Sequence, residues 1–213
     1  MRIMLKETKP SGAFYNIQSC GSSAVPDGFY EVADGVELSC GGFGTRTVVD
    51  NVVTAFTPDT DKWEKLNTPT IEQVKQNAIN RIDGKCSAAI YSGVTIADKH
   101  YSLSLVTQQN LKTAQDKITA GATSVIFAAD GEEPTVHTAE QITEISNAAY
   151  EWGVVNTSYY AKLQKWIVRE TDTAILNAID YGSMLPNDLM TELATLLVGA
   201  GIDLAKYSTM LGG

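Results

Sequence analysis

The sequence predicts an α+β protein in which a small N-terminal β module precedes a mainly helical domain with a short antiparallel sheet. In residues 1–62, β-branched and aromatic residues form short segments separated by glycines and other turn formers, a pattern typical of short strands. From residue 70 onward, apolar residues recur at spacings of three and four, which places them on one face of a helix. The chain of 213 residues also exceeds the ~100–150 residues of a usual compact domain, so we expect two domains.

The N-terminal module, residues 1–62, is expected to hold short strands and one clear hairpin. The strands are predicted at 2–6, 14–19 and 29–32. The hairpin spans 45–56, because Asp50 and Asn51 tolerate the left-handed backbone of a tight turn between two pairs of valines. Residues 63–69 are mostly polar and predict a linker. Within it, Thr68 and Pro69 favour the start of a helix, as its N-cap and first residue.

The second domain, residues 70–182, begins with a helix whose apolar positions run from Ile71 to Cys86. A hairpin follows, because Val94 and Ile96 precede the turn and three later residues alternate with period two: Tyr101, Leu103 and Leu105. Thr107 is the expected cap of the next helix, which Gly121 ends. A strand at 124–128 completes a three-stranded antiparallel sheet.

A long helical region opens at Thr138 and Gln141, whose spacing is that of a capping box. Gly153 marks a kink or a break in this region, and residues 174–179 add one or two further turns. The remaining residues, 183–213, form a C-terminal helical extension. Its amphipathic helix starts at Pro186 and carries an acidic residue near its positive end.

The net charge of −9, with 16 basic residues spread singly, leaves no basic footprint for a nucleic-acid partner. No apolar run approaches the ~18 residues of a membrane span, so we expect no membrane partner and a soluble protein. The three cysteines form no CxxC pair, and reduced thiols are expected. A bridge between Cys20 and Cys40 is the alternative.

The sequence contains no recognisable catalytic constellation. His100 and His137 stand outside any motif, so we expect structural or surface roles for both and no metal site. The glycine run at 40–44 lacks the lysine and the strand-to-helix context of a phosphate loop. Glu132 and Glu133 are expected to be solvated turn residues. We therefore predict no catalytic, cofactor-binding or metal-binding residue, and no enzyme activity.

Features between His100 and Gly153 carry a resemblance to a known domain. They are Tyr101 in an alternating strand, Gln109, Asn110 and Leu111 at the start of a helix, Gly121 at its end, a strand running into Asp130 and Gly131, and then Thr138 with Gln141. Residues 71–182 thereby resemble a recurrent domain of unknown function in bacteriophage tail and appendage proteins. The β-rich segment before them resembles the leader that often precedes that domain.

The resemblance implies a non-enzymatic structural protein of the virion, part of a tail, baseplate, fibre or other appendage and assembled in the host cytoplasm. Its partners would be other phage structural proteins, and homo-oligomers, trimers among them, are expected. One alternative is a tail-fibre assembly chaperone that is absent from the mature particle. Another is a glycan-active appendage enzyme, which would need two carboxylates about 5–10 Å apart.

Two groups of residues are expected to contact partner subunits. The first is the aromatic group of the β module, Phe14, Tyr15, Phe29 and Tyr30, and the second lies on the C-terminal helix, Met190, Leu193 and Leu197. Interfaces are enriched in aromatic residues and methionine, and open strands add readily to a neighbour's sheet. Packing within the chain's own core is the alternative for both groups.

Overall fold

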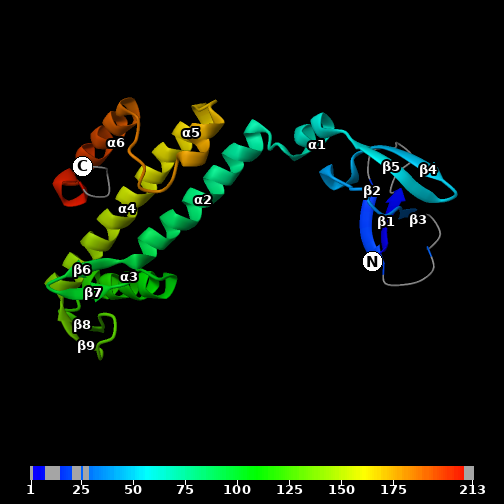
Figure 1. The fold of residues 1–213 in the computed structure, drawn as a ribbon. Helices are drawn as coiled ribbons and strands as arrows, with labels where there is room; N and C mark the ends of the chain where they lie inside the picture. Colours follow the sequence, from blue (N-terminus) through cyan, green and yellow to red (C-terminus); the bar gives the residue numbers. More distant parts are fainter. Residues whose placement is uncertain (1, 8–14, 21–24, 26–28, 209–213) are drawn as a thin grey trace. The chain divides into compact units, whose positions relative to one another are not determined.

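The structure is a computed structural model that describes residues 2–7, 15–20, 25 and 29–208, with the backbone alone described for the first two segments (Figure 1). By its internal contacts the chain divides into two compact units, Met1–Thr70 and Ile71–Gly213. The first unit is built on a β-sheet, and the second consists of helices and two hairpins. The fold class is therefore α+β, as the sequence predicts.

The N-terminal unit contains a five-stranded sheet with the strand order β2-β1-β3-β5-β4. Its strands are β1 (Arg2–Glu7), β2 (Tyr15–Cys20), β3 (Phe29–Val32), β4 (Gly44–Val49) and β5 (Val52–Pro58). Neighbouring strands are antiparallel except β3 and β5, which run parallel. All the predicted strand segments are found close to their expected bounds, and β2 and β4 form the two edges of the sheet.

The hairpin of β4 and β5 has the predicted turn. Asp50 and Asn51 both adopt a left-handed backbone, with φ angles of 50° and 65°. At the other end of the hairpin, Gly44 lies against the opposite strand so closely that a Cβ there would be 2.1 Å from the Thr57 carbonyl oxygen. The pairing of β4 with β5 therefore requires glycine at position 44.

The described core of the N-terminal unit is small. Val32 and Val53 are buried together, and the buried Phe43 lies with its ring centroid 5.8 Å from that of Trp63. Phe43 follows a single 3-10 turn, η1 (Cys40–Gly42), and Cys40 is a free thiol. The glycine run at 40–44 is thus a turn that leads into β4.

The segment predicted as a linker is largely helical. Helix α1 (Thr60–Asn67) begins after Asp59, whose carboxylate accepts a hydrogen bond of 3.0 Å from the Lys62 amide. Thr68 is the C-cap of α1 and not the N-cap of the following helix, which begins at Ile71. Local hydrogen bonds therefore satisfy backbone groups at both ends of α1. Apolar periodicity alone does not predict a helix of this kind.

Two long antiparallel helices, α2 (Ile71–Ser92) and α4 (Ala139–Arg169), form the spine of the second unit (Figure 1). The predicted capping box at the start of α4 is confirmed: Thr138 and Gln141 each bond the other's backbone amide. The break considered at Gly153 is absent, because α4 is one continuous helix of 31 residues.

Helix α4 takes part in two separate hydrophobic clusters. Its N-terminal part contributes Ile142 and Ile145 to a cluster with Leu111 and Phe127, which we call the hairpin cluster. Its C-terminal part contributes Val155, Tyr159, Leu163 and Ile167 to the larger helix cluster, which also holds residues from α2 and from the C-terminal segments. One helix thereby connects both cores.

The hairpin cluster is covered by two hairpins and α3 (Leu105–Thr119). The hairpins are two separate two-stranded sheets, β6 (Val94–Ile96) with β7 (Lys99–Tyr101), and β8 (Ser124–Phe127) with β9 (Thr135–Thr138). The expected three-stranded sheet is therefore wrong. Strand β8 pairs with β9, which the sequence analysis does not predict, and not with the hairpin of β6 and β7.

The expected start of α3 is also corrected. Ser104, not Thr107, is the N-cap, and its hydroxyl accepts a hydrogen bond of 3.1 Å from the Thr107 amide. Leu105, predicted as an inward strand position, is the first residue of the helix and is exposed. The strand-like alternation ends at Leu103 because the cap redirects the chain.

The C-terminal segments pack onto the spine rather than extending from it. They comprise α5 (Thr173–Ala178), α6 (Asn187–Gly199) and the short 3-10 helix η2 (Leu204–Tyr207). Leu189 of α6 is buried in the helix cluster. Ion pairs fasten α6 to α4, with Arg169 bound to Asp188, and with both Lys162 and Lys165 bound to Glu192. Among the described residues, no helix has the length and hydropathy needed to span a bilayer.

Candidate functional site

A serine, a histidine and an aspartate lie together where β7 meets the turn after β8. The His100 Nδ1 is 2.8 Å from Asp130 Oδ2, and the Ser102 hydroxyl donates to Asp130 Oδ1 at 3.1 Å. The Ser102 amide also donates to Asp130 Oδ2, at 2.9 Å. Burial raises the pKa of Asp130, but the bonds from His100 and Ser102 outweigh it and hold the pKa below its ordinary value.

This cluster has the residue types of a catalytic triad but a different connectivity. A triad places histidine between serine and aspartate, so that the imidazole can take the hydroxyl proton. Here Asp130 lies between the other two, and the Ser102 hydroxyl donates to the carboxylate instead. The Asp130 amide also donates to the His100 carbonyl, at 2.8 Å. The cluster therefore fastens one hairpin to the other.

The second histidine belongs to the core. His137 is only 6% exposed, its Nε2 is 3.5 Å from the Tyr101 hydroxyl, and its ring meets Phe127 edge-on. Among the described residues, no three histidine, cysteine or acidic side chains are grouped to hold a metal ion. In the turn before β9, Glu132 forms an ion pair with Lys99, and the neighbouring Glu133 is exposed.

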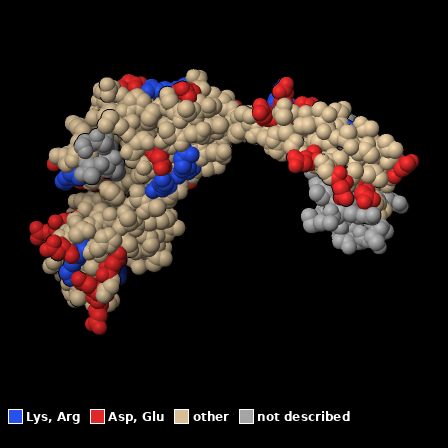
Figure 2. Space-filling model, viewed as in Figure 1, with Lys and Arg blue, Asp and Glu red and all other residues tan. Residues whose placement is uncertain are grey.

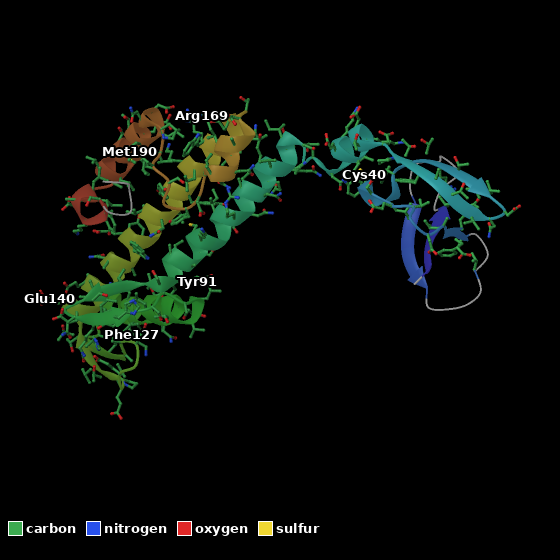
Figure 3. The ribbon with its side chains drawn as sticks, viewed as in Figure 1. Cys40, Tyr91, Phe127, Glu140, Arg169 and Met190 are labelled. Carbon is green, nitrogen blue, oxygen red and sulfur yellow. The ribbon has the colours of Figure 1, made fainter. Side chains whose placement is uncertain are left out.

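A groove of about 820 Å³ lies between α3 and β8. Its volume is within the range of ~300–1,000 Å³ that is typical of binding pockets. Five residues of α3 form one side, Thr107, Asn110, Thr113, Ala114 and Lys117. Residues 124–128 form the other side, and Phe127 of this strand is buried in the hairpin cluster. Figure 3 labels Phe127 at the hairpin end of the helical unit.

The strand that lines this groove has an open edge. In the described part of the chain, β8 pairs with β9 alone, so its second edge carries no strand. Ile126 and Val136 face each other across the two strands and are 71% and 69% exposed. We call the open edge of β8 together with this exposed pair the hairpin surface. Figure 2 shows acidic side chains gathered at the same end of the helical unit.

A second, smaller cleft of about 380 Å³ lies among the end of α2, α3 and α4. Its walls are mainly apolar, with Ile90, Leu103 and Leu111 among the lining residues. Gln115 and Ser146 are also among the lining residues, and the buried Gln115 Oε1 and Ser146 Oγ atoms have no hydrogen-bond partner within the described residues.

Of the four aromatic residues predicted from the sequence to contact partners, Phe29 and Tyr30 have described side chains. Phe14 lies outside the described residues, and Tyr15 lies on the edge strand β2. Phe29 and Tyr30 are half-buried on β3, where the Arg46 guanidinium lies 4.7 Å from the centre of the Tyr30 ring.

The three residues proposed on the C-terminal helix belong to the helix cluster. Leu193 and Leu197 are 0% exposed, and Met190 is partly buried against the same core. The prediction of an exposed interface is therefore corrected for Leu193 and Leu197, which stabilise the chain's own fold. The amphipathic stripe on α6 is used to dock this helix onto α4.

Sequence reasoning missed the hairpin surface. Ile126 alternates with the inward-facing Val125 and Phe127, and this period-two pattern was the available signal. The signal is weak because β8 has only four residues, three of them apolar, so inward and outward positions do not differ in polarity. In addition, the sequence analysis does not predict its partner strand, β9.

A model of the family described as "Domain of unknown function (DUF4376)" matches residues 73–182. The matched region contains both hairpins, the groove and the smaller cleft, whereas the N-terminal sheet and α6 lie outside it. No curated protein and no solved structure matches the chain.

Proposed function

The chain belongs to the DUF4376 family, and from this premise we propose that it is a non-enzymatic structural protein of a bacteriophage virion that acts by binding other subunits. The viral setting rests on the resemblance of residues 71–182 to a domain of phage tail and appendage proteins. The assembly role rests on the fold. Partners would be other structural proteins of the particle, together with further copies of this chain.

The hairpin surface is the observation that carries the assembly role. An open strand edge offers backbone donors and acceptors to another chain, and natural proteins usually cover or charge such edges. Here the cross-strand pair beside the edge is apolar, since Ile126 and Val136 both face outward. Burying them would contribute about 25 cal/mol for each Å² of apolar area removed from water. A partner polypeptide can satisfy both the edge and the apolar pair.

The N-terminal unit supports the same role. Its sheet ends in the edge strands β2 and β4, and the buried hydrophobic residues among its described side chains are Val32, Phe43 and Val53. Units of this size often gain stability from oligomerisation, because their own cores are limited. We expect this unit to serve in attachment, by adding its edge strands to a neighbouring sheet.

The polar clusters favour binding over catalysis. Asp130 holds His100 and Ser102 in one structural cluster, and His137 is enclosed in the core. Nucleophilic catalysis would need a base aimed at the nucleophile. In this fold the serine hydroxyl is turned toward the carboxylate.

The proposal is tested by mass spectrometry of purified particles from a phage that encodes this chain, with the protein quantified against the major tail subunit. A double variant, Ile126→Lys with Val136→Lys, places two charges on the hairpin surface. The matched control is Val198→Lys, since Val198 is also an exposed apolar residue (61%) but lies on α6, away from the hairpins (Figure 1).

We expect the wild type and the Val198→Lys control to be present in particles at a fixed low ratio to the major tail subunit. The double variant should be absent from the particles. Abundance of the wild type in infected cells but absence from particles would favour the chaperone and overturn the proposal. Normal incorporation of a correctly folded double variant would exclude the hairpin surface as the contact.

A further inference from the structure

The groove between α3 and β8 runs along the edge of the strand that carries no neighbour. Every residue from 124 to 128 lines it, whereas none of the described residues of β9 does. Successive residues of a strand point to opposite faces of a sheet, so a wall that contains all of them is an edge and not a face. The groove is therefore a space beside the backbone of β8, on the side away from β9.

The backbone of Ile126 presents its polar groups to this space. In an antiparallel ladder, hydrogen-bonded pairs alternate with non-bonded pairs. The Ala139 amide donates to the Thr123 carbonyl at 3.0 Å, which continues the register of the two strands by one pair. Counting by two along β8, the other bonded positions are Val125 and Phe127. The N–H and C=O groups of Ile126 consequently point away from β9, and no backbone hydrogen bond outside the ladder reaches them within the described residues.

The facing wall of the groove is polar and accessible. Asn110, Thr113 and Lys117 recur at spacings of three and four on α3, so they share one helix face, and all three are exposed. From Thr107 to Lys117 this face extends about 15 Å along the helix. Residues 124–128 extend about 16 Å along the strand. The two walls therefore match an extended segment of about five residues.

The two ends of the groove carry opposite charges. Lys117 lies at the end where α3 turns toward β8, since the Ala122 amide donates to its carbonyl at 3.0 Å. Asp130 lies at the other end, where the chain leaves β8. A segment that runs antiparallel to β8 would place its C-terminal end beside Lys117 and its N-terminal end beside Asp130. An acidic residue at the first of these ends and a basic residue at the second would complement both charges.

We propose that the groove binds one extended segment of a partner polypeptide, antiparallel to β8, with a basic residue at its N-terminal end and an acidic residue at its C-terminal end. The segment adds a strand to the hairpin, because its backbone bonds the N–H and C=O groups of Ile126. Antiparallel pairing is the commoner and slightly more stable arrangement of two strands. The inference rests on the proposed role in assembly, and it names the chemistry of the contact.

The test uses the full chain in solution and two blocked pentapeptides of the same composition. The first is acetyl-Lys-Val-Thr-Val-Glu-amide, and the second is its reverse, acetyl-Glu-Val-Thr-Val-Lys-amide. Binding is followed by chemical-shift changes of the backbone amides of α3 and β8. We expect the first peptide to bind, and the reverse peptide to bind about fivefold more weakly, because in the antiparallel orientation it places like charges at both ends of the groove.

N-methylation of the first peptide tests whether it adds as a strand. A methyl group removes one backbone N–H, and the N–H groups of successive strand residues point to opposite edges. Methylation of the central threonine and methylation of the valine after it therefore affect opposite edges of the peptide. One of the two should abolish binding, and the other should leave it nearly unchanged.

Two variants of the chain, each with a matched control, locate the segment. Ile126→Pro removes the N–H on the open edge and should abolish binding, and proline is tolerated in an edge strand where the N–H faces away from the ladder. Ile126→Val, its control, keeps the N–H and should bind normally. Lys117→Glu should remove the preference between the two peptides, whereas Lys112→Glu, on α3 but outside the groove, should retain it.

The inference would be overturned by the absence of binding of both peptides at millimolar concentration, by equal binding of the two peptides to the wild type, or by equal effects of the two methylations. Unchanged binding by a folded Ile126→Pro variant would also overturn it. A wild-type dimer that Ile126→Pro dissociates would assign the groove to a second copy of the chain instead. The purified chain is measured throughout, so the result does not depend on whether the protein is found in particles.

Discussion

The two units of this chain differ in the hydrophobic residues that they bury among the described side chains. The helical unit has two clusters that share α4, and fourteen buried residues belong to the larger one. In the N-terminal unit, the described buried hydrophobic residues are Val32, Phe43 and Val53, and the sheet has two edges. Among the described side chains, the larger buried core therefore lies in the helical unit. The helical unit is expected to fold from its own contacts, whereas the sheet is expected to gain stability from partners.

The largest expected effect comes from the helix cluster. Leu163 is 0% exposed on α4, so Leu163→Ala should lower the free energy of unfolding of the helical unit by about 2–5 kcal/mol through lost burial and a cavity. Urea denaturation followed by far-UV circular dichroism measures this loss. Val198→Ala, at an exposed position of the same unit, should stay within about 0.5 kcal/mol of the wild type. A similarly small effect of Leu163→Ala would show that the helical unit is not stabilised by this core.

A matched pair of glycines tests whether the two units are independent. A Cβ on Gly93 would lie 2.0 Å from the Tyr101 carbonyl oxygen, and a Cβ on Gly44 would lie 2.1 Å from that of Thr57. Each alanine variant should therefore cost roughly 1–3 kcal/mol of local strain, confined to its own unit.

Hydrogen exchange of the backbone amides measures both variants residue by residue. Gly93→Ala should lower protection near β6 and β7, and Gly44→Ala should do so near β4 and β5. Gly84→Ala is the control, since a Cβ there meets nothing and alanine favours the helix by about 1 kcal/mol. Loss of protection in both units from either variant would contradict the division of the chain.

The smallest expected effect concerns the ion pairs that hold α6. The hydrogen bond from Arg169 lowers the pKa of Asp188 to about 2. A carboxylate with a lowered folded-state pKa contributes stability that is fully present above its ordinary pKa. Here the contribution should be lost as the pH falls from about 4 to about 2. Acid titration of unfolding should show a flatter pH dependence in this window for Asp188→Asn, and identical curves would exclude a role for the pair.

The sequence specified the local signals of the fold well. The capping box of Thr138 and Gln141 and the turn at Asp50 and Asn51 depend on nearest neighbours, and both are confirmed. The predicted start of α3 is wrong because Ser104 and Thr107 are both good N-cap residues. Which of the two caps the helix depends on where the preceding hairpin ends, and the sequence does not specify that end. Strand β9 was missed because it consists of four residues and borders directly on α4.

The candidate site depended on packing that the sequence does not encode locally. Leu193 and Leu197 have the pattern of an amphipathic helix, but the pattern does not say whether its apolar face meets the same chain or another. The sequence predicts a strand at 124–128 but not which of its side chains are exposed, and the exposure of Ile126 follows from α3 and α4 covering only one face of the hairpin. The burial of Leu193 and Leu197 and the exposure of Ile126 are therefore both determined by tertiary contacts.

The length and continuity of helix α4 have a mechanical consequence for the helical unit. Its 31 residues span about 46 Å as one rod, with one end fixed in the hairpin cluster and the other in the helix cluster. A force applied to the hairpins would be transmitted along α4 through its backbone hydrogen bonds to the helix cluster, and no loop would lie in its path. The domain should therefore behave as a stiff strut that transmits load from one end to the other.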